Sequence, residues 1–231
     1  MLKKKTAQTV YQRLYDAYGP QHWWPADSAF EVMVGAVLTQ NTAWKNVEQA
    51  IANLRQGDYL DLQRLLSLSP QKLAGLIRPS GYFNIKAQRL RNLCLWLQAE
   101  GGIKVLAQHD TSRLRNSLQT VNGVGPETAD DILLYAFARP VFVIDVYTRR
   151  LFARLGLITG AEPYETLRGY FETALPADVP LYNEYHALIV RHAKERCVDT
   201  EQCRHCGVER YQGSGIRGQG SGVKNRRRLV L

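Results

Sequence analysis

The sequence has no apolar run that approaches the roughly 20 residues of a membrane span. The basic residues of its first segment, MLKKKTAQTVYQRLY, are followed by no apolar stretch of the kind found in signal peptides. Alternating runs of β-branched residues are nearly absent, and the one exception, residues 140–144 (PVFVI), is too short to found a sheet. We therefore expect an all-α protein of the cytoplasm with no membrane partner.

Cysteine is scarce and unevenly distributed. Of the four cysteines, Cys197, Cys203 and Cys206 lie within ten residues near the C-terminus. Such a cluster is typical of metal ligation and not of a disulfide framework. Cys94 lies instead on the apolar face of an expected helix and is interpreted as a buried small hydrophobe.

Positive charge is concentrated at the C-terminal end. The formal net charge is +9, and residues 207–231 hold six Lys or Arg against one Glu, so they supply five of the nine charges. A basic tail either seeks nucleic acid or merely improves solubility. Because it is rich in Gly, Ser and Arg and lacks apolar periodicity, we expect this tail to be disordered.

Helical patterns cover most of the remaining chain. Apolar residues between Leu90 and Leu97 recur with the period of one buried helix face. Ser28 to Glu31 has the form of a capping box, and the apolar run behind it, residues 29–38, predicts a buried central helix. Further helices are expected near residues 6–18, 43–55, 70–77, 111–119, 126–138, 145–155, 163–174 and 179–195. The length suffices for one large domain or two small helical lobes.

Two glycines, Gly123 and Gly125, flank Val124 between two expected helices. Glycine permits a tight turn with positive φ, and backbone amides without side chains can approach a phosphate at the start of the next helix. Pro126 suits the first helical position, where its missing N–H costs nothing. The segment predicts a phosphate-binding hairpin, although an ordinary turn between helices explains Gly-Val-Gly equally well.

About twenty residues after the hairpin, the segment VIDVYTRR places Asp145 after an apolar run at a helix start. Together the two segments resemble the endonuclease III-like DNA glycosylases of the helix-hairpin-helix (HhH-GPD) superfamily, and the resemblance runs from roughly residue 28 to Cys206. It implies a two-lobed all-α monomer of the nucleoid that removes damaged bases from double-stranded DNA. It also implies that Asp145 is the catalytic carboxylate, which stabilises positive charge on the sugar and orients the attacking water. Capping its helix is the alternative role of Asp145.

Glu127 departs from the family pattern. Bifunctional members carry a lysine here, two residues after the second hairpin glycine, and that lysine forms the Schiff base that leads to strand cleavage. A carboxylate cannot do this, so we expect a monofunctional glycosylase in which Glu127 holds a water or a base edge, or merely starts its helix with a favourable charge. The alternatives are a bifunctional enzyme for oxidised pyrimidines and a noncatalytic DNA-binding module.

The segments HWWP and LTQNTAW resemble the branch of the family that removes 3-methyladenine. This resemblance implies a base pocket formed by Trp23, Trp24, Pro25 and Trp44. Their π-faces would attract the positive charge of an alkylated purine. Packing between lobes is the alternative role of these side chains.

Polar residues with candidate roles in DNA binding lie on both sides of the expected site. By the resemblance, Gln40 fills the gap left by the extruded base, or else it only ends its helix. Lys86 is a candidate phosphate contact, beside the backbone of Gly123, Val124 and Gly125.

The spacing Cys197-x5-Cys203-x2-Cys206 resembles the loop that ligates a 4Fe–4S cluster in this family, where four thiolates are the rule. The fourth position falls on Gln212, and no cysteine follows. Three outcomes stay open: a cluster with a noncysteine or open fourth site, a zinc ion with His192 or His205 as fourth ligand, or a degenerate loop. We thus divide the chain into a glycosylase domain, residues 1–206, and the tail. The domain holds a core at 28–193, a hairpin at 121–125 and a cysteine loop at 194–206.

Overall fold

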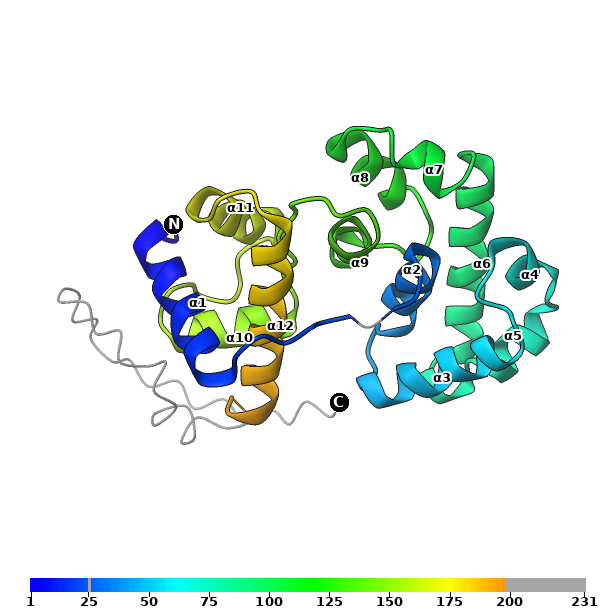
Figure 1. Cartoon of the computed structure of the whole chain (residues 1–231), viewed down its shortest axis with the longest axis horizontal. Helices are drawn as coiled ribbons and strands as arrows, with labels where there is room; N and C mark the ends of the chain where they lie inside the picture. The colour runs from blue at the N-terminus through cyan, green and yellow to red at the C-terminus, as the bar shows by residue number, and fades with distance from the viewer. Residues whose placement is uncertain (25, 198–231) are drawn as a thin grey trace.

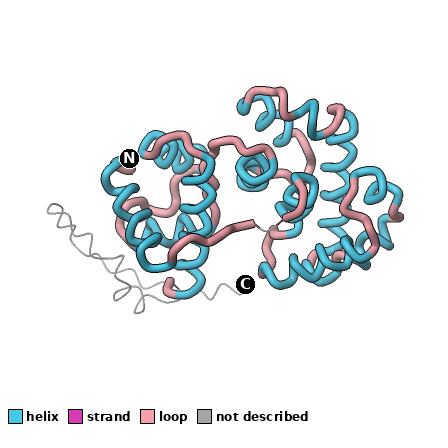
Figure 2. The backbone as a smooth tube through the Cα atoms, in the orientation of Figure 1, coloured by secondary structure: helices cyan, strands magenta, loops and turns pink. Residues whose placement is uncertain are grey.

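The computed structural model of the chain describes residues 1–24 and 26–197, and every regular element in these ranges is a helix (Figures 1 and 2). The predicted all-α class is confirmed for this part of the chain. No described helix is long and apolar enough to cross a membrane. Pro25, the last nine residues of the predicted cysteine loop and the predicted tail lie outside the described residues.

The larger lobe is built around one buried helix. Helix α2 (Ala29–Leu38) is buried at every position after its first, as its apolar sequence predicts. Ser28 caps α2 by accepting a hydrogen bond from the Glu31 N–H at 3.1 Å, but the Glu31 carboxylate pairs with Arg55 at 2.6 Å and does not complete the capping box. The other helices of this lobe are α3 (Trp44–Gln56), α4 (Leu62–Ser67), α5 (Pro70–Leu76), η1 (Arg78–Ser80), α6 (Phe83–Ala99), α7 (Ile103–Leu106), α8 (Thr111–Gln119) and α9 (Pro126–Asp131).

The smaller lobe joins the start of the chain to its last described helices (Figure 1). It contains α1 (Lys4–Tyr18), α10 (Val146–Arg154), α11 (Tyr164–Ala174) and α12 (Val179–Glu195). Its core is rich in aromatic residues, with Phe142 stacked on Phe171 at a centroid distance of 4.3 Å. The hydroxyl of Tyr185 donates to the carbonyl of Ala7 at 2.9 Å and so fastens α12 to α1.

The chain passes from the larger lobe back to the smaller one through residues 132–144. The single helix expected over residues 126–138 changes after α9 into a π-helix, η2 (Ile132–Ala136). Leu133 belongs to the core of the larger lobe and Leu134 to that of the smaller lobe. Residues 140–144 then form neither helix nor strand and lead directly to Asp145. π-Turns are frequent at functional sites, and this one lies where the lobes meet.

Candidate active site at the junction of the lobes

The hairpin requires glycine at one of its two positions. Gly123 has φ +99°, and a Cβ there would lie 2.3 Å from Cγ of Arg89. Gly125 has φ −85°, and nothing lies within 4 Å of a Cβ built on it. The positive φ that the sequence suggested for this pair is therefore needed at Gly123 only. Pro126 begins α9, as predicted.

Asp145 has a polar neighbour at each of its carboxylate oxygens. It is the N-cap of α10, where Oδ1 accepts a hydrogen bond from the Thr148 N–H at 2.7 Å. Nε2 of His186 lies 3.4 Å from Oδ2. Burial alone would raise the pKa of Asp145, whose residue is 8% exposed, but His186 and the Thr148 N–H hold that pKa below its ordinary value. The capping role and an ionised carboxylate thus coincide in one residue.

Two further acids face this carboxylate from α9. Glu127 and Asp131 are one helical turn apart and therefore share a face of the helix. Burial, and then the charge of Asp145, raises the pKa of Glu127 to about 7. Burial and the charges of Glu127 and Asp145 raise the pKa of Asp131 well above its ordinary value. The site therefore contains one ionised carboxylate beside two carboxyl groups that retain protons more readily.

The tryptophans approach one another at the junction. Trp24 stacks on Tyr135 of η2 at 4.8 Å and meets Trp44 edge-on at 5.5 Å. Trp23 lies 6.2 Å from Trp44 with a tilt of 31° between the rings. The backbone of Trp24 has φ +62°, and a Cβ at Gly35 would lie 3.3 Å from its ring, so α2 and the aromatic residue fit closely. Three of the four predicted pocket residues are thus brought together, and Pro25 lies outside the described residues.

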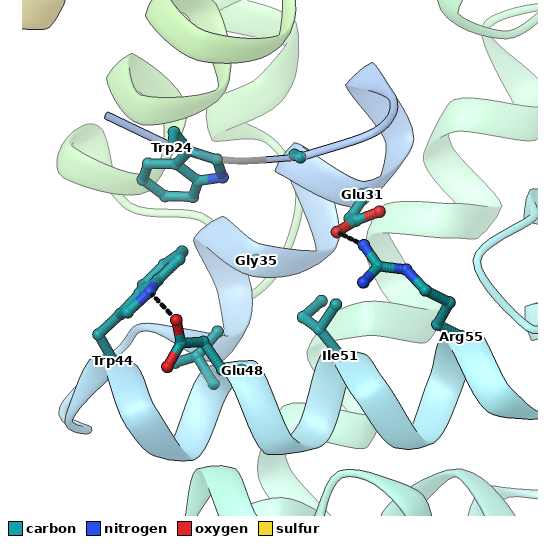
Figure 3. A pocket seen from close by; sticks show the side chains of 9 residues that line it. Trp24, Glu31, Gly35, Trp44, Glu48, Ile51 and Arg55 are labelled. Carbon is teal, nitrogen blue, oxygen red and sulfur yellow. Dashed lines mark hydrogen bonds and ion pairs between the residues drawn. The ribbon is translucent and has the colours of Figure 1, made fainter. Parts of the chain in front are cut away.

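A pocket of about 310 Å³ opens beside Trp24 and Trp44, between α2 and α3 (Figure 3). Trp44 donates through Nε1 to the Glu48 carboxylate at 2.9 Å, and the Glu31–Arg55 pair closes the opposite end. This volume is at the lower end for small-ligand sites, and the combination of aromatic walls with a few polar groups is typical of them.

Gln40 connects α2 to the hairpin. Its Nε2 donates to the carbonyl of Gly123 at 3.0 Å and to Oγ1 of Thr128 at 2.9 Å, and its Oε1 accepts from Arg89 at 2.5 Å. The side chain expected to enter the DNA is therefore fully hydrogen-bonded here, and it must exchange these partners in order to do so.

Lys86 has a different environment from the one that the sequence suggested. It is 1% exposed, and its ammonium donates to the carbonyls of Leu38 at 2.8 Å and Ser80 at 2.7 Å. Burial lowers its pKa to about 8. In this structure Lys86 supports the end of α2 and is not available to a phosphate. Among the exposed residues of the same segment is Tyr82, at 69% exposure and φ +44°.

Sequence reasoning missed three residues of this site. Asp131 and Tyr135 follow Glu127 at intervals of four, a helical spacing that could have identified them. His186 lies on α12, forty-one residues after Asp145 in the sequence, and no local pattern marks it. Its hydrogen-bonded contact with Tyr135, at 2.6 Å, exists only in the folded chain.

The metal predictions fall mainly on residues outside the described part of the chain, namely Cys203, Cys206 and His205. Within the described ranges, no group of three His, Cys, Asp or Glu residues could hold a metal ion. Cys197 is buried, and Nδ1 of His192 lies 2.9 Å from the hydroxyl of Tyr18. Cys94 is buried in the core of the larger lobe, and burial raises the pKa of its thiol to about 12.

Comparison with known proteins identifies the family. Residues 34–177, more than half of the chain, match the family described as HhH-GPD superfamily base excision DNA repair protein. This chain belongs to the HhH-GPD superfamily. A relative from Methanocaldococcus jannaschii, provisionally named a DNA repair glycosylase, is 47% identical over 87% of this chain and 93% of its own length. Endonuclease III of Sulfolobus acidocaldarius is 26% identical over 80% of this chain and 81% of its own length.

Solved structures of glycosylases share the fold of this HhH-GPD protein. The 3-methyladenine DNA glycosylase of H. pylori, in complex with 1,N6-ethenoadenine, is 29% identical with a TM-score of 0.71, covering 84% of this chain and 98% of its own. A noncovalent complex of endonuclease III with DNA has a TM-score of 0.76 at 19% identity, covering 90% of this chain and 94% of its own. The protein is a DNA repair glycosylase of this superfamily.

Proposed function

We propose that this HhH-GPD protein is a monofunctional glycosylase that hydrolyses the N-glycosidic bond of alkylated purines, such as 3-methyladenine, in duplex DNA. The observation that supports this most strongly is the ionised Asp145 carboxylate, buried beside the acids of α9. When a flipped nucleotide brings its sugar against Asp145, the positive charge that develops on the sugar meets a fixed negative charge. Asp145 also orients or deprotonates the water that attacks the sugar.

The surroundings of Asp145 favour a cationic base. The carboxyl groups of Glu127, Asp131 and Asp145 interact with one another, and Tyr135 and His186 connect Asp145 to the ring of Trp24. A purine alkylated on a ring nitrogen carries a positive charge that both carboxylates and π-faces attract. Its glycosidic bond is already weakened, so no strong general acid is required. The base complex of the related H. pylori glycosylase agrees with a modified purine as substrate.

The contacts to DNA are proposed on the same basis. The amides of Gly123, Val124 and Gly125 bind a phosphate, and Gln40 leaves the hairpin to fill the space of the extruded base. Trp23, Trp24, Pro25 and Trp44 enclose the base. The protein acts as a monomer on double-stranded DNA.

One observation favours a second candidate function, that of a glycosylase with lyase activity. Lys194 of α12 lies over the rings of Trp23 and Tyr147, at 6.0 and 5.4 Å, and interacts with the charge of Asp145. Partial burial lowers the pKa of Lys194, which makes its amine a better nucleophile. Attack by this amine on C1′ of the sugar would break the N-glycosidic bond and release the base. The sugar ring would then open to a Schiff base, from which elimination of the 3′ phosphate cleaves the strand; the carboxyl of Glu127 cannot form such a Schiff base.

The iron–sulfur cluster of endonuclease III-type relatives is not part of this proposal. The sequence supplies three thiolates where four are the rule, and the position of the fourth is Gln212. The ligand set is therefore incomplete for such a cluster, and no step of the reaction depends on it.

The products of the reaction test the proposal. Purified protein is incubated with methylated duplex DNA, released purines are resolved by chromatography, and strand nicking is assayed with and without alkali. We expect 3-methyladenine, nicks that require alkali, and no covalent adduct after borohydride. Nicking without alkali, together with an adduct that is lost in Lys194→Met, would establish the second candidate instead. Release of oxidised pyrimidines and no purine would contradict the substrate.

A further inference from the structure

A chain of side chains connects the aromatic residues to the catalytic carboxylate. The Trp24 ring stacks on Tyr135 at 4.8 Å. The hydroxyl of Tyr135 lies 2.6 Å from Nδ1 of His186. On the other side of the imidazole, Nε2 lies 3.4 Å from Oδ2 of Asp145. His186 is 4% exposed, so water is largely excluded from these contacts.

We propose that His186 is the positioning residue of Asp145, and that Tyr135 fixes the tautomer in which Nε2 carries the proton. The inference rests on the proposed function, in which Asp145 is the catalytic carboxylate. His186 itself touches neither the sugar nor the base. It acts by donating to Oδ2 while the backbone of Thr148 donates to Oδ1.

The two polar neighbours of His186 select this tautomer. The carboxylate oxygen of Asp145 that faces Nε2 at 3.4 Å can only accept, so the hydrogen belongs on Nε2, and Nδ1 is left to accept from the Tyr135 hydroxyl, which stays protonated because burial raises its pKa. A neutral imidazole whose Nδ1 accepts must carry its hydrogen on Nε2, toward Asp145. Within the described residues Nε2 has no regular hydrogen-bond partner, and 3.4 Å is long for such a bond. Such contacts are often long in the free enzyme and shorten when substrate binds.

Tyr135 also contacts one of the tryptophans of the expected base pocket, Trp24. Because its ring stacks on Trp24, a base that shifts the Trp24 ring would also shift the hydroxyl that contacts His186. The arrangement therefore couples occupation of the base pocket to the orientation of the carboxylate.

Other groups also influence the titration of this chain and must be considered in any pH profile. Those that interact electrostatically with Asp145 are Glu127 and Asp131 of α9, Tyr135 of η2, Tyr147 of α10 and Lys194 of α12. Glu184 of α12 acts on Tyr135, and Arg149 of α10 acts on Glu127. Each of them is retained in the variants below except Tyr135, so a change between His186 variants reports on His186.

The test measures base release from methylated duplex DNA against pH for wild type, His186→Leu, His186→Gln and Tyr135→Phe. His186→Leu should lower kcat about 10- to 100-fold, with KM little changed. That is the loss typical in metal enzymes when a residue that orients a metal-binding side chain is removed. The acid limb of His186→Leu should move to higher pH, because Asp145 loses the partner that lowers its pKa. His186→Gln, whose amide can donate to Asp145, should restore most of kcat. The kcat of Tyr135→Phe should lie between that of His186→Leu and that of wild type.

A purely structural role would not move the acid limb. Thermal unfolding of each variant identifies any loss of fold, and Tyr135→Phe decides the question if His186→Leu does not fold. An acid limb and kcat equal to those of wild type in His186→Leu, or in Tyr135→Phe if His186→Leu does not fold, would overturn the inference. If the inference is overturned in this way while wild type is active and Asp145→Asn is inactive, the proposed function still holds and only the role of His186 is wrong. If wild type releases no purine, both fail together.

Discussion

At the scale of single residues, Asp145 joins two roles that sequence reasoning sets against each other. As the N-cap of α10 it accepts a backbone hydrogen bond, and that bond is one of the contacts that keep it ionised. The pKa values of the neighbouring acids, Glu127 and Asp131, are shifted in the opposite direction, because burial and the charge of Asp145 favour their protonated forms. Opposed shifts within one site are a common mark of acid and base assignments in enzymes.

Glu127 provides a prediction about pH. Its pKa of about 7 means that the carboxyl is protonated below that pH and can then donate a hydrogen bond to a base edge. Base release should therefore decline as the pH rises through about 7. Glu127→Gln keeps an N–H donor at all pH values, so this alkaline limb should disappear from its kcat profile. If Glu127→Gln shows the same alkaline limb in kcat as wild type, that limb reports the titration of a group other than Glu127.

The residues found from the sequence are those with a local signal. The spacing after the hairpin identified Asp145 as a candidate, and the two adjacent tryptophans identified the aromatic residues Trp23, Trp24 and Trp44. His186 and the buried environment of Lys86 could not be found in this way, because both depend on contacts between elements distant in sequence.

At the scale of elements, most helices were predicted to within a few residues, because their apolar period and caps are local. The sequence missed α4 and α7, which have six and four residues and are too short to establish a period. It also missed the change from α9 to η2. Nothing in residues 126–138 breaks a helix, and it is the packing of Leu133 and Leu134 into two different cores that accompanies the π-turn.

The two hairpin glycines give a matched pair of variants. Gly123→Ala should destabilise the fold by about 1–3 kcal/mol, because the alanine must hold a positive φ and its Cβ meets Arg89. Gly125→Ala should change the free energy of unfolding by well under that amount, since its φ is negative and the space around it is open. Urea denaturation of both variants measures the difference. Equal effects would contradict the account of the hairpin.

At the scale of the whole molecule, the site depends on the relative position of the two lobes. Arg115 of α8 forms a charged pair with the fully buried Asp130 of α9 at 2.6 Å and reaches Glu165 of α11 at 2.7 Å. The hydroxyl of Tyr164 donates to Asp130 at 2.9 Å. This cluster fastens the helix that bears Glu127 to the smaller lobe, which bears Asp145.

Removal of Arg115 should loosen this junction. Arg115→Met leaves Asp130 buried without its main partner, which costs about 3–5 kcal/mol of unfolding free energy. Arg64→Met, which removes an exposed pair with Asp58, is the matched control and should cost at most about 1 kcal/mol. Urea unfolding curves of both variants give the comparison. A loss in Arg115→Met no larger than in the control would mean that the cluster does not hold the lobes together.

The most direct test of the account is the single-turnover rate of purine release by Asp145→Asn, measured beside its affinity for the same methylated duplex. Asparagine is an equally good N-cap, so α10 should keep its start and the protein its fold. We predict DNA binding close to that of wild type and a rate at least about 100-fold lower, the scale of losing one electrostatic contact to a transition state. A folded, DNA-binding Asp145→Asn variant that releases purine at the wild-type rate would contradict the assignment of Asp145.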